Sequence, residues 1–558
     1  MSVWRRFGRR LFDYAPIILF LAAFVSIAPW GNYPLNDDDL YAHAARNFVE
    51  TGHIKLAPVI TPALVGQIVL AAPFIKLFGF SHTLLRVLTI LLGAFGIWAL
   101  GRILRRAAVD ARTRFVAQCA LAFNPIYFCM SGTFMTEIYG WVPPLLGTCL
   151  WLWDRERQDR LDRPDGARTP IVSRPVALAF AVIAGSSFWI RQFCVLVYPA
   201  VVGGALLRLA SLRDWRRLER SWLTLFLATS VFVLVVLLYF PWAAATGNES
   251  ATFKVPFARL LSVDGRALVI ETAVYIVYMT CFALPLLALI DWRDRRRLRH
   301  LLVGLALLVV GLGLPVLLRA YPDNNELHQR FPYLGNILYD TGLGAILLPE
   351  NLNTLNAGQP HWRPVYWEIV SGLLSILLVL WTPLLIKLPA AFCRSKSTLA
   401  FEVLCFGLLL SGLSFVFTLQ AYKFAIYDRY HLPGLIGALC VVGVMAPGAI
   451  SRGRFMMGLI VVLPIALFSW TAAHDDYRWN DAIVTLLKRS ASHGVPAHSV
   501  EDSFPYWDAL EPSRPRGVVA PGRYRLSMTR HPNDSVIDSV QPDYWLADGP
   551  PVYLLRDP

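Results

Sequence analysis

Residues 83–101 read TLLRVLTILLGAFGIWALG, an apolar run that contains a single arginine. A run of about 20 apolar residues is long enough for a helix to cross the hydrocarbon core of a bilayer. Comparable runs recur along the chain at 15–31, 83–101, 115–131, 138–153, 176–190, 192–208, 221–243, 268–290, 301–319, 365–387, 398–420, 430–447 and 455–472. We therefore predict an all-α polytopic membrane protein with about 13 transmembrane helices.

The composition of the 558-residue chain agrees with this fold class. Hydrophobic residues make up 56% of the chain and charged residues 16%, whereas soluble domains usually carry about 25% charge. A formal net charge of +14 ordinarily suggests nucleic-acid binding, but the positive charges are scattered as short Arg clusters between apolar runs. This distribution indicates a topology in a lipid bilayer and no nucleic-acid partner.

The distribution of positive charge also predicts the orientation. Counted from the N-terminus, alternate connections hold 30 Lys and Arg residues, and the intervening connections hold 13. The positive-inside rule then places the N-terminus in the cytoplasm, and an odd number of spans places the tail outside. We predict a transmembrane domain over 1–472 in the cytoplasmic (inner) membrane and a small C-terminal domain over 473–558, periplasmic or extracellular, with a helix at 479–488 and a strand at 551–555.

Two long connections face outward on this map, 32–82 and 320–364. Loops of this length often bind ligands. Within the first, residues 61–79 are apolar but contain Pro62, Pro73 and Lys76. If they crossed the membrane, every later Arg cluster would face outward, so we predict a juxtamembrane helix that lies in the outer interface or re-enters it.

An acidic run begins a predicted helix in the first external segment. Residues 37–41 read DDDLY, and apolar residues then recur at helical spacing as far as Gly52. An acidic first turn is a common helix cap, but a cap needs one carboxylate and three in succession repel one another. Two interpretations therefore remain open for Asp37, Asp38 and Asp39. They form the acidic first turn of a helix, or one acts as a general base while another binds a cation.

Four more charged residues stand at predicted outer boundaries of the membrane. Glu137 is the ionised side chain of the hairpin after the third apolar run, and Arg86, Arg191 and Arg429 stand at outer ends of spans. Arginine suits bidentate contact with phosphate, although a boundary arginine also snorkels to the interface for no catalytic reason. Because all four residues face the same compartment, they can converge on one site.

These features resemble the GT-C superfamily, the integral-membrane glycosyltransferases that use polyprenyl-phosphate-linked sugars. Residues 37–52 are similar to its acidic first-loop motif, and Glu137 resembles its second acidic position. Arg86 resembles the arginine that opens the next span, and Arg429, Tyr430 and Pro433 form a late R-Y-x-x-P element. The topology resembles the subgroup of the lipid A aminoarabinose transferase and the protein mannosyltransferases.

One family element is absent. Many relatives carry Lys-Pro-Pro after the first-loop helix, and that lysine helps to hold the donor phosphate. This chain reads PVITP at 58–62. We therefore expect Lys55 or Arg86 to stand in for the missing lysine.

The resemblance implies inverting transfer of a sugar from a polyprenyl-phosphate carrier to a hydroxyl of a lipid, polysaccharide or protein outside the cytoplasmic membrane. It implies Asp37 or Asp38 as the base and Glu137 as a second acid. Asp38 and Glu137 are also candidate ligands of a divalent cation such as Mg, Mn or Zn, and no organic cofactor is expected. The candidate substrate contacts are Asp39, Tyr41, Lys55, Arg86, Arg191, Arg429 and Tyr430.

A transporter or flippase of a lipid-linked substrate is the alternative from another functional class, and a non-catalytic scaffold is a third. Ion-coupled transporters usually place ionisable residues at the midplane of the membrane. In this sequence such residues are few near mid-span, and no inverted repeat is apparent. The sequence therefore favours the transferase.

Overall fold

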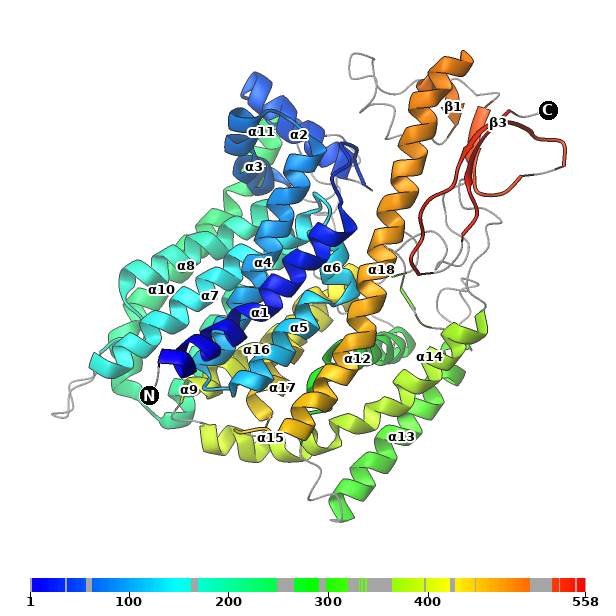
Figure 1. The fold of residues 1–558 in the computed structure, drawn as a ribbon. Coiled ribbons are helices and arrows are strands. Elements are labelled where there is room, and N and C mark those ends of the chain that lie inside the picture. Colours follow the sequence, from blue (N-terminus) through cyan, green and yellow to red (C-terminus); the bar gives the residue numbers. More distant parts are fainter. Residues whose placement is uncertain are drawn as a thin grey trace.

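A computed structural model of the protein describes residues 3–35, 38–56, 63–161, 169–247, 265–290, 298–319, 331, 333, 334, 337, 338, 364–395, 398–421, 427–446, 448–501, 524–530, 532–546 and 549–556. Asp37 and most of the predicted external connection 320–364 lie outside these residues. The described part is a bundle of helices with a small sheet near the C-terminus (Figure 1).

Most residues of the predicted spans lie in helices. The first half of the chain forms α1 (Val3–Ile27), α2 (Asp38–Thr51), α3 (Val65–Phe78), α4 (His82–Arg106), α5 (Ala111–Ala122), α6 (Pro125–Ser131), α7 (Thr136–Leu161), α8 (Arg174–Ser186), α9 (Val197–Leu212), α10 (Trp215–Leu237) and α11 (Tyr239–Thr246). The second half forms α12 (Gly265–Leu287), α13 (Leu298–Arg319), α14 (Pro364–Leu377), α15 (Thr382–Ser395), α16 (Leu399–Ala421), α17 (Leu432–Met445) and α18 (Arg452–Ser490). Short 3-10 turns join several of them, namely η1 (Ser187–Trp189), η2 (Gln192–Leu196), η8 (Leu378–Trp381), η10 (Asp428–His431), η11 (Ala491–His493) and η12 (Ala497–Ser499).

Seven helical stretches among the described residues are long and apolar enough to cross a membrane, judged by length and composition. Shorter apolar helices accompany them, including Phe12–Ile27 and Arg174–Trp189. The protein is therefore a helical membrane protein, and the number of about 13 spans stays a prediction.

The run at 115–131 is not one helix but two. Asn124 accepts hydrogen bonds through its side chain from the backbone N–H groups of Ile126 and Tyr127, both at 3.1 Å, and Pro125 opens α6. Proline cannot donate the backbone N–H that a continuous helix needs, whereas it fits the first turn of a new one. The break turns α6 toward the connection that precedes α7.

The predicted juxtamembrane helix at 61–79 is present as α3. Its 14 residues are fewer than the about 20 that a crossing needs. It ends at Gly79, whose φ of 83° suits glycine. The outward side chains of Leu77 and Phe78 are apolar and exposed, while Gln67 is buried against the bundle. The exposed side of α3 is therefore apolar, and its predicted place in or near the outer membrane interface stays a prediction.

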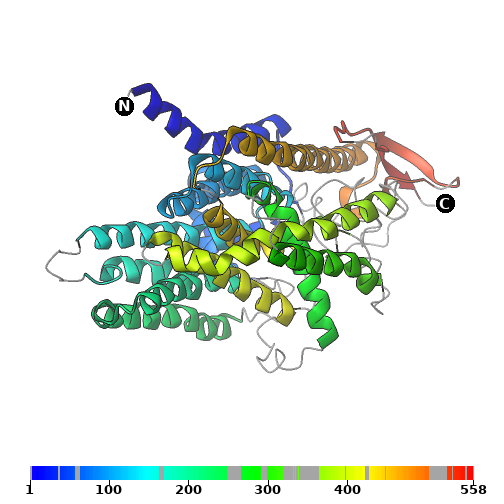
Figure 2. The same ribbon diagram turned by 90° about the horizontal axis from the view of Figure 1, so that it is seen from below.

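The longest helix, α18, joins the bundle to the tail. It has 39 residues and runs without a break across the predicted domain boundary at residue 473. Its length is about 58 Å at a rise of 1.5 Å per residue. In both views α18 lies along one side of the bundle, and the sheet stands beside its C-terminal end (Figures 1 and 2). The predicted helix at 479–488 is thus the last part of α18.

The tail sheet has four strands, β1 (Val500–Glu501), β2 (Tyr524–Ser527), β3 (Ser535–Val540) and β4 (Val552–Arg556), in the order β1-β2-β4-β3. β1 and β2 are parallel, and β4 pairs antiparallel with both β2 and β3. Leu526 and Leu554 of the sheet pack with Ile483 and Leu486 of α18 in a hydrophobic cluster separate from the main core. The predicted strand at 551–555 corresponds to β4.

Candidate functional site

Asp38 opens α2 and connects it to the turn before α7. It is 3% exposed. One carboxylate oxygen accepts a hydrogen bond from the backbone N–H of Leu35, and the other accepts one from Phe134 at 3.2 Å. The first bond goes back to a residue that precedes α2 and fixes the entry to the helix, whereas an N-cap side chain accepts an N–H from inside the helix. The second bond makes Asp38 a bridge between segments that lie far apart in the sequence.

The environment of Asp38 changes its acidity. Burial raises the pKa of this carboxyl to about 8, although the Arg86 charge and the two backbone N–H bonds act in the opposite direction. A carboxyl group with such a pKa is a stronger base than an exposed one once its proton has left. Asp38 therefore links two segments of the chain, and its raised pKa suits the role of base that the resemblance implies.

The turn before α7 is held from three sides. The Phe134 N–H donates a hydrogen bond to Asp38, and the Phe134 carbonyl accepts one from the Gln67 side chain of α3 at 2.9 Å. The Tyr477 hydroxyl of α18 donates to the carbonyl of Gly132 at 2.8 Å. Sequence reasoning missed Gln67 and Tyr477 because neither carries a charge or a motif.

Glu137 follows this turn directly, in the first turn of α7. Its side chain is fully buried, and one carboxylate oxygen, Oε1, lies 3.3 Å from Arg191 Nη2 and 3.2 Å from Arg429 Nε. One carboxylate therefore forms ion pairs with two buried guanidinium groups. The structure brings together three of the residues that the sequence analysis selected, and we call them the outer cluster.

Glycine at position 140 permits this approach. A Cβ atom at Gly140 would lie 2.5 Å from the Cys194 sulfur and 3.1 Å from the Arg191 Cβ. Both distances are too short for an ordinary carbon contact. The backbone of α7 therefore comes close to the turn that carries Arg191, one helical turn beyond Glu137.

Aromatic rings surround the two arginines of the outer cluster. The Arg191 guanidinium lies 5.2 Å from the ring centres of both Phe193 and Tyr430, and the Arg429 guanidinium lies 5.0 Å from the Tyr427 ring. Such cation–π contacts hold a guanidinium in place without using its N–H groups. Tyr430 thus positions Arg191, which places the R-Y pair of the late motif inside the outer cluster.

The first external segment reaches the outer cluster. Asp38 accepts a hydrogen bond from Phe134, and the three residue steps from Phe134 to Glu137 span at most about 11 Å. Tyr41, one turn beyond Asp38, is buried and interacts electrostatically with Arg191. Asp38, Tyr41 and the outer cluster therefore belong to one region, as the shared compartment predicts.

Lys55 and Arg86, which were selected as phosphate contacts, do not belong to the outer cluster. Lys55 is exposed beyond the end of α2. Arg86 is 1% exposed and donates hydrogen bonds to the carbonyls of Pro29, Gly31 and Tyr33, at 2.7, 2.9 and 2.9 Å. These three bonds tie the start of α4 to the chain that enters the first external segment. Arg86 therefore organises this segment.

Asp39 also lies inside the protein. It is 1% exposed, and its Oδ1 lies 3.5 Å from Nε2 of His43, one turn along α2. Its expected substrate contact stays a prediction.

The predicted cation site does not have a matching set of ligands among the described residues. They contain no group of three or more His, Cys, Asp or Glu side chains that could hold a metal ion. Asp38 faces two backbone N–H groups, and Glu137 faces two guanidinium groups. Backbone N–H groups donate hydrogen bonds to Asp38, and guanidinium groups form ion pairs with Glu137, at the positions where a cation would bind, so the proposed reaction uses no metal.

Asp428 was not selected from the sequence, yet it is fully buried beside Arg429. Its two carboxylate oxygens accept the backbone N–H groups of Ile337 at 3.0 Å and Leu338 at 2.5 Å. It therefore ties described residues of the connection 320–364 to the chain segment of the outer cluster. Its position next to Arg429 at the boundary of a predicted span was the feature of the sequence that could have identified Asp428.

No protein-family model and no curated protein matches the chain. Among solved structures the chain is similar to ArnT from Cupriavidus metallidurans bound to undecaprenyl phosphate, with 13% identity and a TM-score of 0.38 over 97% of this chain and 98% of that one. It is also similar to AglB from Archaeoglobus fulgidus in complex with an inhibitory peptide and a dolichol-phosphate, with 12% identity and a TM-score of 0.44 over 87% of this chain and 58% of that one. A complex of the Archaeoglobus oligosaccharyltransferase with Zn and sulfate gives 11% identity and a TM-score of 0.31 over 85% and 55%.

The ArnT and AglB structures are GT-C glycosyltransferases, the group that the motifs of this chain resemble. The chain spans nearly the whole of ArnT and little more than half of AglB. At these identities and TM-scores the similarity assigns neither a reaction nor a residue to this chain. Those assignments rest on its own side chains.

Proposed function

We propose that this protein is a GT-C type glycosyltransferase that moves a sugar from a polyprenyl-phosphate carrier to an acceptor hydroxyl on the outer side of the cytoplasmic membrane. The observation that carries the proposal is the outer cluster, in which Arg191 and Arg429 share the carboxylate of Glu137. Within the outer cluster, two guanidinium groups face one carboxylate in a buried place. Guanidinium groups in such a place suit the oxygens of a phosphate.

In the proposed step the acceptor oxygen bonds to the anomeric carbon while the bond from that carbon to the carrier phosphate breaks, with inversion. The phosphate leaves with the bonding electron pair, and a carboxylate takes the acceptor proton. We assign the base to Asp37 or Asp38 and the stabilisation of the departing phosphate to Arg191 and Arg429. Glu137 sets the position of both arginines.

The proposed donor carrier is a polyprenyl phosphate, the class of ligand that the ArnT and AglB structures contain. The proposed acceptor is a hydroxyl of a lipid, an envelope polysaccharide or a protein. The Tyr430 ring lies against the Arg191 guanidinium, and Tyr41 interacts electrostatically with Arg191, so we assign these two described side chains to substrate contact. Asp39 and Lys55 remain weaker candidates because neither lies in the outer cluster.

The test uses purified full-length protein in proteoliposomes with radiolabelled polyprenyl-phosphate sugars and a panel of acceptors. We expect the label to move to an acceptor and free polyprenyl phosphate to accumulate. The Arg191→Ala variant should lower this transfer strongly because a phosphate ligand is lost. Arg46→Ala is the matched control, since Arg46 forms an exposed ion pair with Glu50 on α2.

The same experiment tests the transporter alternative. A flippase would move the labelled lipid between leaflets without releasing the carrier phosphate from the sugar. Translocation with no transfer to any acceptor in the panel would contradict the proposed function. If the protein catalyses neither transfer nor translocation, the result would favour the non-catalytic scaffold.

A further inference from the structure

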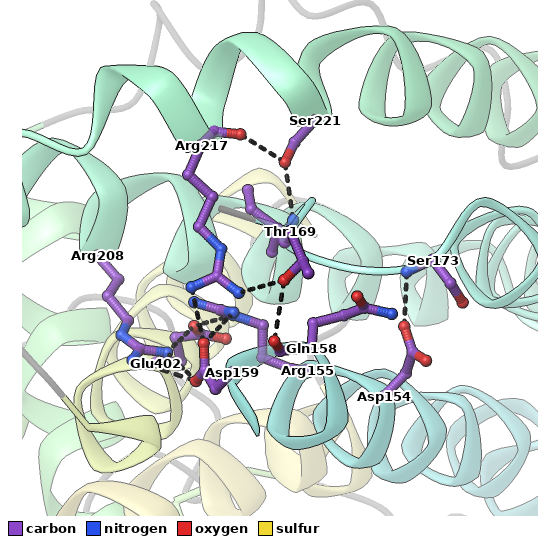
Figure 3. Close-up of polar contacts among 11 residues, drawn as sticks. Asp154, Arg155, Gln158, Asp159, Thr169, Ser173, Arg208, Arg217, Ser221 and Glu402 are labelled. Carbon is purple, nitrogen blue, oxygen red and sulfur yellow. Dashed lines mark hydrogen bonds and ion pairs between the residues drawn. The ribbon is translucent and has the colours of Figure 1, made fainter. Parts of the chain in front are cut away.

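A second buried cluster joins the other ends of helices that lead to the outer cluster. Glu402, in the first turn of α16, accepts hydrogen bonds at Oε1 from Arg155 Nε at 2.8 Å and from Arg208 Nη1 at 2.7 Å. These three residues are 3%, 1% and 4% exposed. Figure 3 shows them converging from α7, α9 and α16. We call Arg155, Arg208 and Glu402 the inner cluster, because they lie on the predicted cytoplasmic side.

Asp159 extends the inner cluster by one helical turn of α7. Its carboxylate lies 2.6 Å from Arg155, 3.4 Å from Arg208 and 2.8 Å from Arg217 at the start of α10. Arg217 also donates to the Thr169 hydroxyl at 3.5 Å (Figure 3). A network of several shared, buried charges holds its geometry better than a single exposed pair does. Four helix ends therefore meet at one polar junction.

The inner and outer clusters have the same composition on the same chain segments. α7 begins near Glu137 and contains Arg155 toward its end, and Arg191 precedes η2 and α9, which contains Arg208 toward its end. α16 begins near Glu402, and Arg429 follows it in η10. The acid comes from α7 in the outer cluster and from α16 in the inner one. Each cluster thus joins three segments through one carboxylate that two arginines share.

The two clusters are separated by about the thickness of a bilayer core. Glu137 and Arg155 are 18 residues apart on α7, which corresponds to about 27 Å along the helix axis. Between the clusters α9 packs against α16, and α16 packs against α17. Close-packed interiors transmit strain, so a shift at one end of these packed helices reaches the other end.

Aromatic packing connects these helices directly beneath the outer cluster. The Phe193 ring lies 5.0 Å from Phe417 of α16, 5.5 Å from Tyr430 and 5.4 Å from Trp141 of α7. Residues of all three segments therefore touch one ring. Rotation or sliding of α16 would move Phe193 and Tyr430, which are the rings that hold Arg191.

The contacts of the inner cluster are the shorter ones. Glu402 accepts hydrogen bonds at 2.7 and 2.8 Å, whereas Glu137 lies at 3.2 and 3.3 Å from its two arginines. We propose that Arg155, Arg208 and Glu402 are positioning residues, which fix the register of α7, α9 and α16 and thereby the spacing of Arg191 and Arg429 around Glu137. The expected effect on catalysis rests on the proposed glycosyl transfer. The coupling between the inner and outer clusters does not depend on that proposed function.

Glu402→Asp is the most informative variant. It keeps the negative charge but shortens the side chain by one methylene, so the helices must shift to restore the two hydrogen bonds. We expect kcat for sugar transfer to fall about 10- to 100-fold, because small misplacements of remote origin have effects of that size. The matched control is Glu156→Gln, which removes a carboxylate paired with Arg106 and Arg160 at the same end of α7 but outside the inner cluster.

Hydrogen–deuterium exchange of the two variants supplies a readout that does not depend on activity. In Glu402→Asp we expect faster amide exchange in the outer segments 187–197 and 427–431 as well as near residue 402. In Glu156→Gln the outer segments should exchange as in the wild type. If wild-type protein transfers no sugar, the proposed function fails while the exchange result still decides the positioning role.

A charge exchange within the inner cluster tests the pairing itself. Glu402→Arg places three arginines together and should abolish transfer or folding. Combining it with Arg208→Glu restores one acid between two arginines and should restore both folding and most of kcat. Unchanged exchange in the outer segments of Glu402→Asp, together with wild-type kcat, would overturn the proposal.

Discussion

The hydroxyl of Tyr33 donates a hydrogen bond to the carboxylate of Asp481 at 2.7 Å. Tyr33 lies in the chain that leads from α1 to the acidic motif, and Asp481 lies on the extension of α18 toward the tail sheet. Asp481 in turn pairs with Arg478 at 2.8 Å, and Arg478 donates to the carbonyl of Ile27. The tail helix and the first external segment are therefore joined by a polar network.

This network continues into the tail. Asp475 accepts the backbone N–H groups of Trp545 at 2.7 Å and Leu546 at 3.0 Å, and the Trp545 ring stacks on His474 with centres 3.6 Å apart. Asp475 is 3% exposed. The tail is thus fastened to α18 one helical turn from the residues that contact the first external segment.

We expect Asp475→Ala to release this part of the tail. Two backbone N–H groups lose their acceptor, and each lost bond to a carboxylate costs about 1.5 to 3 kcal/mol. Limited proteolysis should cut the variant near residues 541–549 faster than it cuts the wild type. If the tail shapes the choice of acceptor, the variant should also change the relative rates with different acceptors. Asp543→Ala is the control, and equal cleavage of the Asp475→Ala and wild-type proteins would contradict the anchoring role.

The elevated pKa of Asp38 predicts a pH dependence of stability. Its folded-state pKa of about 8 lies above the value of about 3.9 of an exposed aspartate. The folded state therefore holds the proton more tightly, and the contribution of this group to stability decreases as the pH rises from about 4 to about 8. Thermal unfolding of Asp38→Asn should show a flatter dependence on pH over that range than the wild type. Parallel curves would contradict the elevated pKa.

The same acidity predicts a pH profile for transfer if Asp38 is the base. The active form is the carboxylate, so the transfer rate should rise with pH until about 8. Asp38→Asn should then lower the rate about 100- to 10,000-fold. Asp37→Asn is the companion variant, and a large loss in Asp37→Asn with a small loss in Asp38→Asn would assign the base to Asp37. Wild-type rates in both variants would remove both residues from the chemistry.

Glu137→Gln tests the outer cluster by its effect on stability. Removing the acid leaves two buried guanidinium groups without their counter-charge, and such a loss typically costs about 3 to 5 kcal/mol. A polyprenyl phosphate supplies negative charge, so it should raise the Tm of the variant more than it raises the Tm of the wild type. Equal Tm shifts in the two proteins would contradict phosphate binding at this cluster.

Gly140→Ala tests the close approach of α7 to Arg191. The added methyl would lie 2.5 Å from the Cys194 sulfur, so α7 and the turn at 191 must separate. We expect a lower Tm and a higher KM for the lipid donor, because Arg191 moves away from Glu137. Gly412→Ala on α16 is the control, since no atom lies within 4 Å of the position of its Cβ. A wild-type KM in Gly140→Ala would indicate that the arginine position is not critical.

Arg86→Lys separates positioning from phosphate binding. Lysine cannot reproduce the planar fork that donates to three carbonyls, so the variant should lose stability by about 1 to 3 kcal/mol. Because the positive charge remains, a residue that only binds phosphate should tolerate the change. A lower Tm with an unchanged Kd for polyprenyl phosphate would confirm the structural role, and the reverse result would restore the family-based assignment.

Local properties of the sequence predicted much of the fold. Long apolar runs predicted where helices occur, and Gly79 ends one of these helices, whereas the break at Asn124 divides a run that was predicted as one helix. The helix α3, the helix after Trp479 and the last strand followed from the same local rules. The residues of the outer cluster were also selected from the sequence, because an ionised group at a membrane boundary needs a partner.

The sequence alone thus determined a helical membrane protein with an acidic first-loop motif and a set of boundary charges. Only the tertiary structure decided which charges pair, because partners such as Glu137 and Arg429 are brought together by helix packing across most of the chain. The tertiary structure also decided that Arg86 donates hydrogen bonds to backbone carbonyls and that Asp38 accepts one from the Phe134 N–H. Hydrogen bonds act over about 3 Å, and sequence periodicity does not specify positions at that scale.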